Sequence, residues 1–121
     1  MPIFTDARTV PAGSVIDTDL AIIGAGPAGM SLAMALANTP IRILLLESGG
    51  GEYEAATQAL YKGSETGVRY LPLDACRLRF LGGSSNHWGG WCRPLDPSDF
   101  EKRAWLAHSG WRFSRKEIEP Y

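Results

Sequence analysis

The sequence has few of the features that mark specialised classes of protein. Only two cysteines occur in 121 residues, Cys76 and Cys92, which are too few for a disulfide scaffold and fit a reducing compartment. No run of 18 apolar residues is present, so we expect no membrane span. The net charge is −1 and basic pairs such as Arg77/Arg79 are isolated, so we expect no nucleic-acid partner.

Further absences narrow the chemistry. Residues 1–15 carry acidic as well as basic side chains and no apolar core, so we expect no secretory signal and a cytoplasmic location. The spacing of cysteines and histidines matches no zinc pattern, so no metal site is predicted. No G-x-S-x-G elbow is present to anchor a hydrolase triad. A hydrophobic content of 45% is otherwise that of an ordinary globular protein.

The most informative stretch joins an apolar run to a glycine pattern. Leu20–Ile23 leads directly into Gly24-x-Gly26-x-x-Gly29, and an Ala/Leu/Met-rich segment follows, which predicts a buried strand, a tight turn and the first turns of a helix. In such a unit Gly24 permits the turn, Gly26 lets the backbone approach a pyrophosphate, and Gly29 lets the helix pack on the strand. Pro27 suits a first helical position, and the helix start attracts negative charge. The stretch predicts a dinucleotide site.

A second strand and an acidic residue complete this pattern. The helix is expected over residues 27–38, because Thr39-Pro40 disfavours its continuation. The apolar run Ile41–Leu46 predicts a buried parallel strand. Glu47 comes 23 residues after Gly24, where an acidic side chain accepts hydrogen bonds from a ribose diol. The alternative is a solvated glutamate before a glycine-rich turn.

A second glycine-rich stretch covers residues 77–94. The pair Gly82-Gly83 offers backbone N–H groups suited to a small anion nest. Trp88 and Trp91 supply flat apolar surface against which a ring can lie. Side chains that can donate to phosphate or ribose oxygens follow the glycines: Ser84, Ser85 and Asn86. The alternative is a glycine-rich loop whose tryptophans fill a core.

The two motifs together resemble those of one enzyme family. Arg77-x-Arg79-x-Leu81-Gly82-Gly83-Ser84-Ser85 resembles the second N-terminal signature of the glucose-methanol-choline (GMC) oxidoreductases. The first glycine motif with Glu47 is similar to that family's FAD fingerprint, and the two cover most of residues 19–95. The resemblance implies FAD as cofactor and oxidation of a CH–OH group, in a sugar, polyol or other alcohol, by hydride transfer to flavin. It leaves the electron acceptor open.

The resemblance also implies a set of site residues. His87-Trp88 is similar to the pyranose-oxidase-like, sugar-oxidising branch, where that histidine is attached to the flavin. A covalent histidyl–FAD bond at His87 is therefore implied, the alternative being a histidine that packs near the flavin. No segment matches the family's catalytic histidine region, so no catalytic residue is named. The implied cofactor contacts are Gly24, Ala25, Gly26, Pro27, Ala28, Gly29, Glu47, Arg77, Gly82, Gly83, Ser84, Asn86 and His87.

We expect an α/β fold, the N-terminal part of an FAD-binding Rossmann-like domain with an incomplete parallel sheet. Residues 1–18 are expected to be an arm, and residues 19–121 a partial FAD-binding domain with its β–α–β unit at 19–47 and a flavin-contacting loop at 77–94. Two strands do not make an independently stable sheet. We therefore predict a fragment, truncated at its C-terminus and inactive by itself.

Shorter helices are expected outside the β–α–β unit. Residues 54–61 predict one, and the S-x-x-E pattern of a capping box predicts helix starts at Ser98 and Ser114. Two other functions compete with an alcohol oxidase. One is another Rossmann flavoprotein, a monooxygenase or an NAD(P)H-dependent reductase, which shares the first motif. The other is a non-catalytic nucleotide-binding module.

Overall fold

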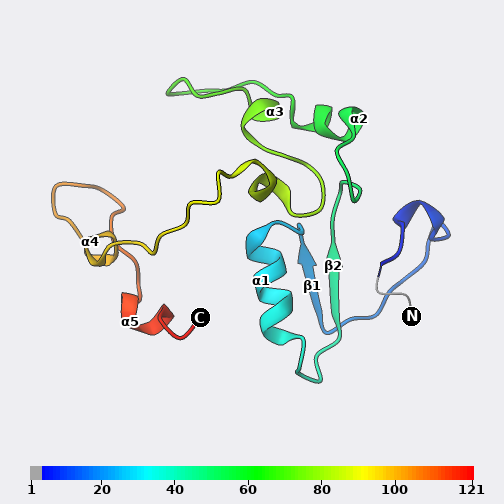
Figure 1. The fold of residues 1–121 in the computed structure, drawn as a ribbon, viewed down its shortest axis with the longest axis horizontal. Helices are drawn as coiled ribbons and strands as arrows, with labels where there is room; N and C mark the ends of the chain where they lie inside the picture. Colours follow the sequence, from blue (N-terminus) through cyan, green and yellow to red (C-terminus); the bar gives the residue numbers. More distant parts are fainter. Residues whose placement is uncertain (1–3) are drawn as a thin grey trace. The chain divides into compact units, whose positions relative to one another are not determined.

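The computed structural model describes residues 4–121, which divide into two compact units, one ending at Trp88 and the other spanning Gly89–Tyr121. The first unit contains, in order, the 3-10 helix η1 (Ala7–Thr9), β1 (Leu20–Ile23), α1 (Pro27–Leu36), β2 (Ile43–Leu46), α2 (Ala55–Gln58), η2 (Ala59–Tyr61), α3 (Leu73–Cys76) and η3 (Gly83–His87) (Figure 1). The second contains two one-turn helices, α4 (Pro97–Phe100) and α5 (Arg115–Ile118).

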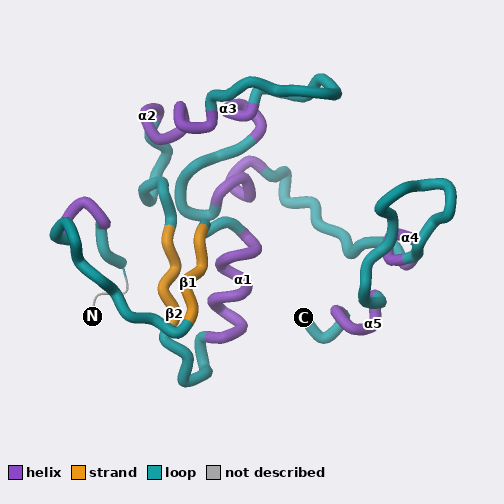
Figure 2. The backbone as a smooth tube through the Cα atoms, turned by 180° about the vertical axis from the view of Figure 1, so that it is seen from behind, coloured by secondary structure: helices purple, strands orange, loops and turns teal. Residues whose placement is uncertain are grey.

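The predicted β–α–β unit is confirmed. β1 and β2 pair in parallel, with Leu20 opposite Ile43 and Ile23 opposite Leu46. α1 joins them and runs alongside the strand pair (Figures 1 and 2). The helix ends at Leu36 rather than at residue 38, because the chain leaves it through tight turns in which Thr39 N–H donates to the Leu36 carbonyl at 3.0 Å.

A reciprocal pair holds the amino ends of the two strands together. The Asp19 carboxylate accepts from the Arg42 backbone N–H at 2.9 Å and from its guanidinium at 2.9 and 3.1 Å. Asp19 N–H donates to the Arg42 carbonyl at 3.0 Å. The guanidinium hydrogen bond lowers the pKa of Asp19, and the carboxylate raises the pKa of Arg42. Arg42 is thus fixed against Asp19, and the regular β2 pairing begins at Ile43, two residues later than expected.

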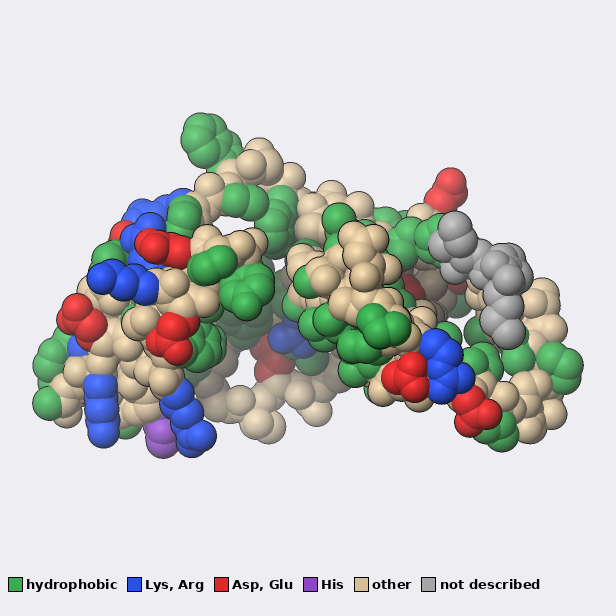
Figure 3. Space-filling model, turned by 90° about the horizontal axis from the view of Figure 1, so that it is seen from below, with side chains coloured by type: hydrophobic (Ala, Val, Ile, Leu, Met, Phe, Trp, Pro, Cys, Tyr) green, Lys and Arg blue, Asp and Glu red, His purple; other side chains and the backbone are tan. Residues whose placement is uncertain are grey.

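The strands are less buried than their apolar sequences predict. In β1 only Ile22 is buried, at 7% exposed, whereas Ile23 is 87% exposed. Alternate residues of a strand face opposite sides of the sheet. α1 covers one side, so the side chains of the other side meet solvent. Figure 3 shows one face of the molecule, on which hydrophobic and charged side chains are both exposed. The expectation of buried strands was wrong, and that of an incomplete parallel sheet is confirmed.

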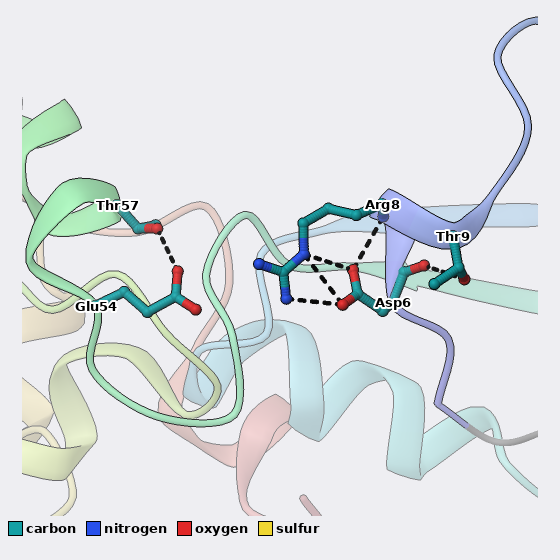
Figure 4. Close-up of polar contacts among 5 residues, drawn as sticks. All are labelled: Asp6, Arg8, Thr9, Glu54 and Thr57. Carbon is teal, nitrogen blue, oxygen red and sulfur yellow. Dashed lines mark hydrogen bonds and ion pairs between the residues drawn. The ribbon is translucent and has the colours of Figure 1, made fainter.

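Local ion pairs and side-chain bonds order the segments that flank the sheet. At η1 the Arg8 guanidinium binds both carboxylate oxygens of Asp6, with Nη2 to Oδ2 at 2.7 Å and Nε to Oδ1 at 3.0 Å (Figure 4). This bonding lowers the pKa of Asp6 to about 2. At the start of α2, Thr57 Oγ1 donates to Glu54 Oε2 at 2.9 Å (Figure 4). The predicted arm at 1–18 therefore carries local structure, although its first three residues lie outside the described part.

The second unit shows one predicted cap and one displaced cap. At α5 the capping box of Ser114 and Glu117 is confirmed, with Ser114 N–H donating to Glu117 Oε2 at 2.7 Å. At α4 the predicted start at Ser98 was wrong, because Asp96 is the N-cap and its backbone N–H donates to Asp99 Oδ2 at 2.9 Å. Pro97 has no N–H and takes the first helical position, so the cap falls on the residue before it.

Candidate cofactor-binding site

The turn after β1 depends on the conformation of Gly24. Its φ of +100° lies in the left-handed region, which side chains with a Cβ disfavour. Its N–H donates to the Leu46 carbonyl at 2.7 Å, which joins the turn to the carboxyl end of β2. Gly24 therefore has the turn-forming role that the motif predicts.

Gly29 and Gly26 are glycines for opposite reasons. A Cβ added at Gly29 would lie 2.0 Å from the Gly24 carbonyl oxygen and 3.2 Å from Ile22 Cγ2, so α1 packs on the strand and turn at a distance that only glycine permits. A Cβ added at Gly26 would meet no atom within 4 Å, and its φ of −78° suits any residue. Protein packing therefore does not require glycine at position 26. The close approach of a pyrophosphate, which the motif predicts, would account for it.

The start of α1 offers unpaired backbone donors. Pro27 occupies the first helical position, and the first bond into the helix runs from Met30 N–H to the Gly26 carbonyl at 3.0 Å. Among residues 4–121 no side chain caps this start, and no acidic residue lies in its first turn. The N–H groups of Ala28 and Gly29 precede the first helical bond, so together with the helix dipole they favour an anion. The donors fit a diphosphate.

Glu47 follows β2 and bonds to the turn after β1. Its Oε2 accepts from Ala25 N–H at 2.8 Å, and its Oε1 accepts from Gly49 N–H at 2.9 Å. The half-buried carboxylate is therefore held in place, and the alternative of a freely solvated glutamate was wrong. A carboxylate has about four acceptor positions, which leaves room for ribose hydroxyls.

Ala25 supports the site through its backbone. The residue is 1% exposed, its N–H is bonded to Glu47, and its carbonyl accepts from Gly82 N–H at 2.9 Å. It holds together the acidic residue and the second glycine loop, and its direct contact with a cofactor stays a prediction.

The second glycine loop lies against this turn, as expected, but it forms no anion nest. A Cβ added at Gly83 would lie 3.3 Å from Gly26 Cα, which places η3 beside the start of α1. Gly82 N–H is used on Ala25, and Gly83 N–H donates to the Phe80 carbonyl at 2.8 Å. With both donors used inside the protein, the predicted nest was wrong. The left-handed φ angles, +89° and +56°, account for the paired glycines.

The polar side chains of this loop mostly shape the loop itself. Ser84 Oγ accepts from Leu78 N–H at 3.2 Å. Asn86 Nδ2 donates to the carbonyls of Leu81 and Gly83, both at 3.0 Å, so its predicted donation to a phosphate competes with these bonds. His87 is exposed. An open hollow of about 430 Å³ lies over this region and is lined by Tyr53, Gln58, Asp74, Leu78, Phe80, Asn86 and His87.

Gln58 and Arg79 support this region and are not among the predicted cofactor contacts, although Arg79 belongs to the Arg-x-Arg motif. Gln58 in α2 is 5% exposed and makes three hydrogen bonds to the backbone of residues 74–79. Arg79 donates from Nη1 to Ser48 Oγ at 3.2 Å, and its guanidinium carbon lies 4.4 Å from the centre of the Tyr61 ring. No spacing rule marks a glutamine in a short helix, so no signal in the sequence could have identified Gln58.

Comparison with known families supports FAD as the cofactor. A family model described as an FAD binding domain, of monooxygenase type, matches residues 17–66. The cofactor of this site is FAD. The match spans β1, α1, β2 and Glu47, supports a flavoprotein oxidoreductase in general, and agrees with the partial Rossmann-like α/β fold. No curated protein and no solved structure matches the chain.

The match corrects the resemblance to the GMC oxidoreductases. That assignment was wrong, because the matching model represents a monooxygenase-type FAD domain and ends at residue 66, before the Arg77–Ser85 motif. The first glycine motif binds the ADP half of FAD in many flavoprotein classes and does not separate them. The paired glycines carried the distinction, and backbone geometry alone accounts for them. A covalent bond to His87 rested on that resemblance and stays a prediction.

No group of three or more histidine, cysteine, aspartate or glutamate side chains among residues 4–121 is placed to hold a metal ion. None of the helices in the same range has the length and apolar character needed to cross a membrane.

Proposed function

We propose that this chain binds the ADP half of FAD in a monooxygenase-type flavoenzyme acting on a small-molecule substrate. The observation that carries the proposal is the uncapped start of α1, with open space at Gly26 and the Glu47 carboxylate held across the turn. The family match at residues 17–66 supports this class over an alcohol oxidase.

The chain's own residues perform binding and orientation. The N–H groups of Ala28 and Gly29 stabilise the diphosphate charge, Gly26 admits it close to the backbone, and Glu47 accepts from the ribose hydroxyls. Bound FAD supplies the two-electron chemistry. We assign no catalytic residue to this chain.

The cellular setting is part of the proposal. Cys76 and Cys92 are both free thiols, and Cys92 is exposed. An exposed thiol persists in a reducing compartment. We therefore propose that the protein works in the cytoplasm.

The proposal is tested by asking which compound reduces the flavin. Full-length protein is purified, and its flavin absorption is followed without oxygen while NADH, NADPH or a panel of sugars and alcohols is added. We expect bleaching by a reduced nicotinamide nucleotide, followed by return of colour on admission of oxygen. Bleaching by a sugar or alcohol alone would overturn the monooxygenase proposal. A bound flavin that no donor reduces would indicate a non-catalytic module.

Oxidation of a sugar or other alcohol is the second candidate. The family match at residues 17–66 supports an FAD-dependent oxidoreductase in general and does not specify the compound that is oxidised. The same anaerobic experiment separates the two reactions, because only the alcohol reaction reduces the flavin without a nicotinamide nucleotide.

A further inference from the structure

Gln58 is the buried polar side chain of the described residues, at 5% exposed. Its Nε2 donates to the Asp74 carbonyl at 2.7 Å and to the Arg77 carbonyl at 2.6 Å. Its Oε1 accepts from Arg79 N–H at 3.0 Å. The amide therefore uses both of its donors and its oxygen on one backbone segment, from the end of α3 to Arg79.

The segment held by Gln58 continues directly into the FAD turn. After Arg79, Leu81 N–H donates to the Gly50 carbonyl at 3.0 Å, and Gly82 N–H donates to the Ala25 carbonyl at 2.9 Å. A Cβ added at Gly49 would lie 2.2 Å from the Arg79 carbonyl oxygen, so the backbones on the two sides are in direct contact. Only two residues, Phe80 and Leu81, thus separate the amide's contact at Arg79 from the bond of Gly82 to Ala25.

We propose that Gln58 is a positioning residue of the FAD site, which fixes the segment Arg77–Gly82 against the turn at Ala25 and thereby sets the affinity for FAD. The inference rests on the FAD site and not on the choice between a monooxygenase and an alcohol oxidase. Gln58 acts through Arg79 and Gly82, since its amide bonds go to protein backbone. A buried polar group without hydrogen-bond partners costs free energy. The backbone from Asp74 to Arg79 is therefore held in the position that pairs with the Gln58 amide.

The substitution Gln58→Glu tests this with little change in shape. A carboxylate accepts but cannot donate, so at neutral pH it would face the Asp74 and Arg77 carbonyls without a proton to share. Burial and these carbonyls favour the protonated form, which donates one bond and accepts another. Lowering the pH should therefore restore the support in this variant.

Other titrating groups surround this position and require a matched control. The side chains of Tyr53, Asp74 and His87 line the same hollow, Arg77 and Arg79 lie on the held segment, and Tyr61 stacks on Arg79. Their response to pH is common to all variants, so each affinity is divided by that of the unsubstituted protein at the same pH. Asn38→Asp, in the exposed turn after α1, adds the same charge away from this contact.

The experiment measures FAD affinity of the full-length protein by flavin fluorescence at pH 7.5 and pH 5.5. At pH 7.5 we expect the Kd of Gln58→Glu to rise about tenfold, the equivalent of one lost buried hydrogen bond. At pH 5.5 it should return to within about threefold of the unsubstituted protein, at most about half the free energy of such a bond. Gln58→Leu should be weakened equally at both pH values, and Asn38→Asp should match the unsubstituted protein.

The contrary results are equally distinct. Unchanged affinity in folded Gln58→Glu and Gln58→Leu would overturn the proposal, as would weakening of Gln58→Glu without recovery at pH 5.5. If Gln58→Glu folds only at pH 5.5, the FAD-bound variant is shifted rapidly to pH 7.5. Release of FAD before the far-UV circular dichroism is lost supports a positioning role. Loss of FAD and of the circular dichroism at the same time overturns it. Reduction of the unsubstituted flavin by an alcohol would overturn the proposed function and leave this result untouched.

Discussion

Replacing Gly26 with alanine should separate FAD binding from folding. The new methyl group meets no protein atom within 4 Å, and the φ of −78° suits alanine, so we expect stability to change by less than about 0.5 kcal/mol, as at ordinary surface positions. The same methyl occupies the space through which the diphosphate approaches the backbone. Losing one hydrogen bond to a charged group costs about 1.5–3 kcal/mol, which raises the Kd for FAD about 10- to 150-fold.

Gly29→Ala is the matched variant with the opposite outcome. Its methyl would lie 2.0 Å from the Gly24 carbonyl oxygen, a backbone atom that cannot move aside by itself. Overpacking of this kind costs up to about 3 kcal/mol, and the higher helix propensity of alanine returns about 1 kcal/mol. We expect a net destabilisation of about 2 kcal/mol.

Thermal melts of the full-length proteins, without FAD and at saturating FAD, read out both effects. Gly26→Ala should keep the cofactor-free Tm and lose most of the rise in Tm on adding FAD. Gly29→Ala should lower the cofactor-free Tm. A Gly26→Ala protein that binds FAD as tightly as the unsubstituted one would refute the placement of the diphosphate over this residue.

Three more outcomes follow from the contacts and burial of the described residues. Glu47→Gln has one oxygen for the two N–H groups of Ala25 and Gly49, so FAD titration should show about a tenfold weaker Kd; unchanged binding would contradict the ribose role. In Asp19→Asn the Tm should fall most at neutral pH. The hydrogen bond from Arg42 holds the pKa of Asp19 below its usual range. The stabilisation from this ion pair is therefore present above about pH 4 and is lost as the pH falls through the lowered pKa. The Tm difference from the unsubstituted protein should therefore shrink in acid, and a constant difference would contradict the pair. The 121-residue chain by itself should show no cooperative melt and substoichiometric FAD, because among residues 4–121 the buried apolar side chains are few: Ile22, Ala25, Leu78 and Phe100; a sharp transition with full binding would contradict this expectation.

The parts that sequence could predict are those determined by neighbours in the chain. The turn at Gly24, the start of α1 and the position of Glu47 follow from glycine geometry and from the spacing of one β–α–β unit. The N-cap of α4 was predicted at Ser98 and lies two residues earlier, at Asp96. Aspartate and serine can both cap a helix, and the choice between them depends on where Pro97 falls in the helix.

The parts that sequence could not predict depend on contacts between distant residues. Gln58 bonds to groups 16 to 21 residues further along, and nothing local distinguishes it from a solvent-facing glutamine. The donors of Gly82 and Gly83 looked available for an anion until their carbonyl partners were located. Exposure of Ile23 likewise depends on which side of the sheet α1 covers, and the apolar run does not encode this.

The bonds from Ala25 and Gly49 to Glu47 have a consequence for how adenosine is captured. A free glutamate side chain gives up about 1.5–2 kcal/mol of rotamer entropy when it is immobilised. Here that loss occurs when the chain folds, because both carboxylate oxygens are already bonded before a nucleotide arrives. The ribose therefore meets an acceptor that is pre-organised, and the strength of its capture depends on how firmly the Gly49 loop is folded.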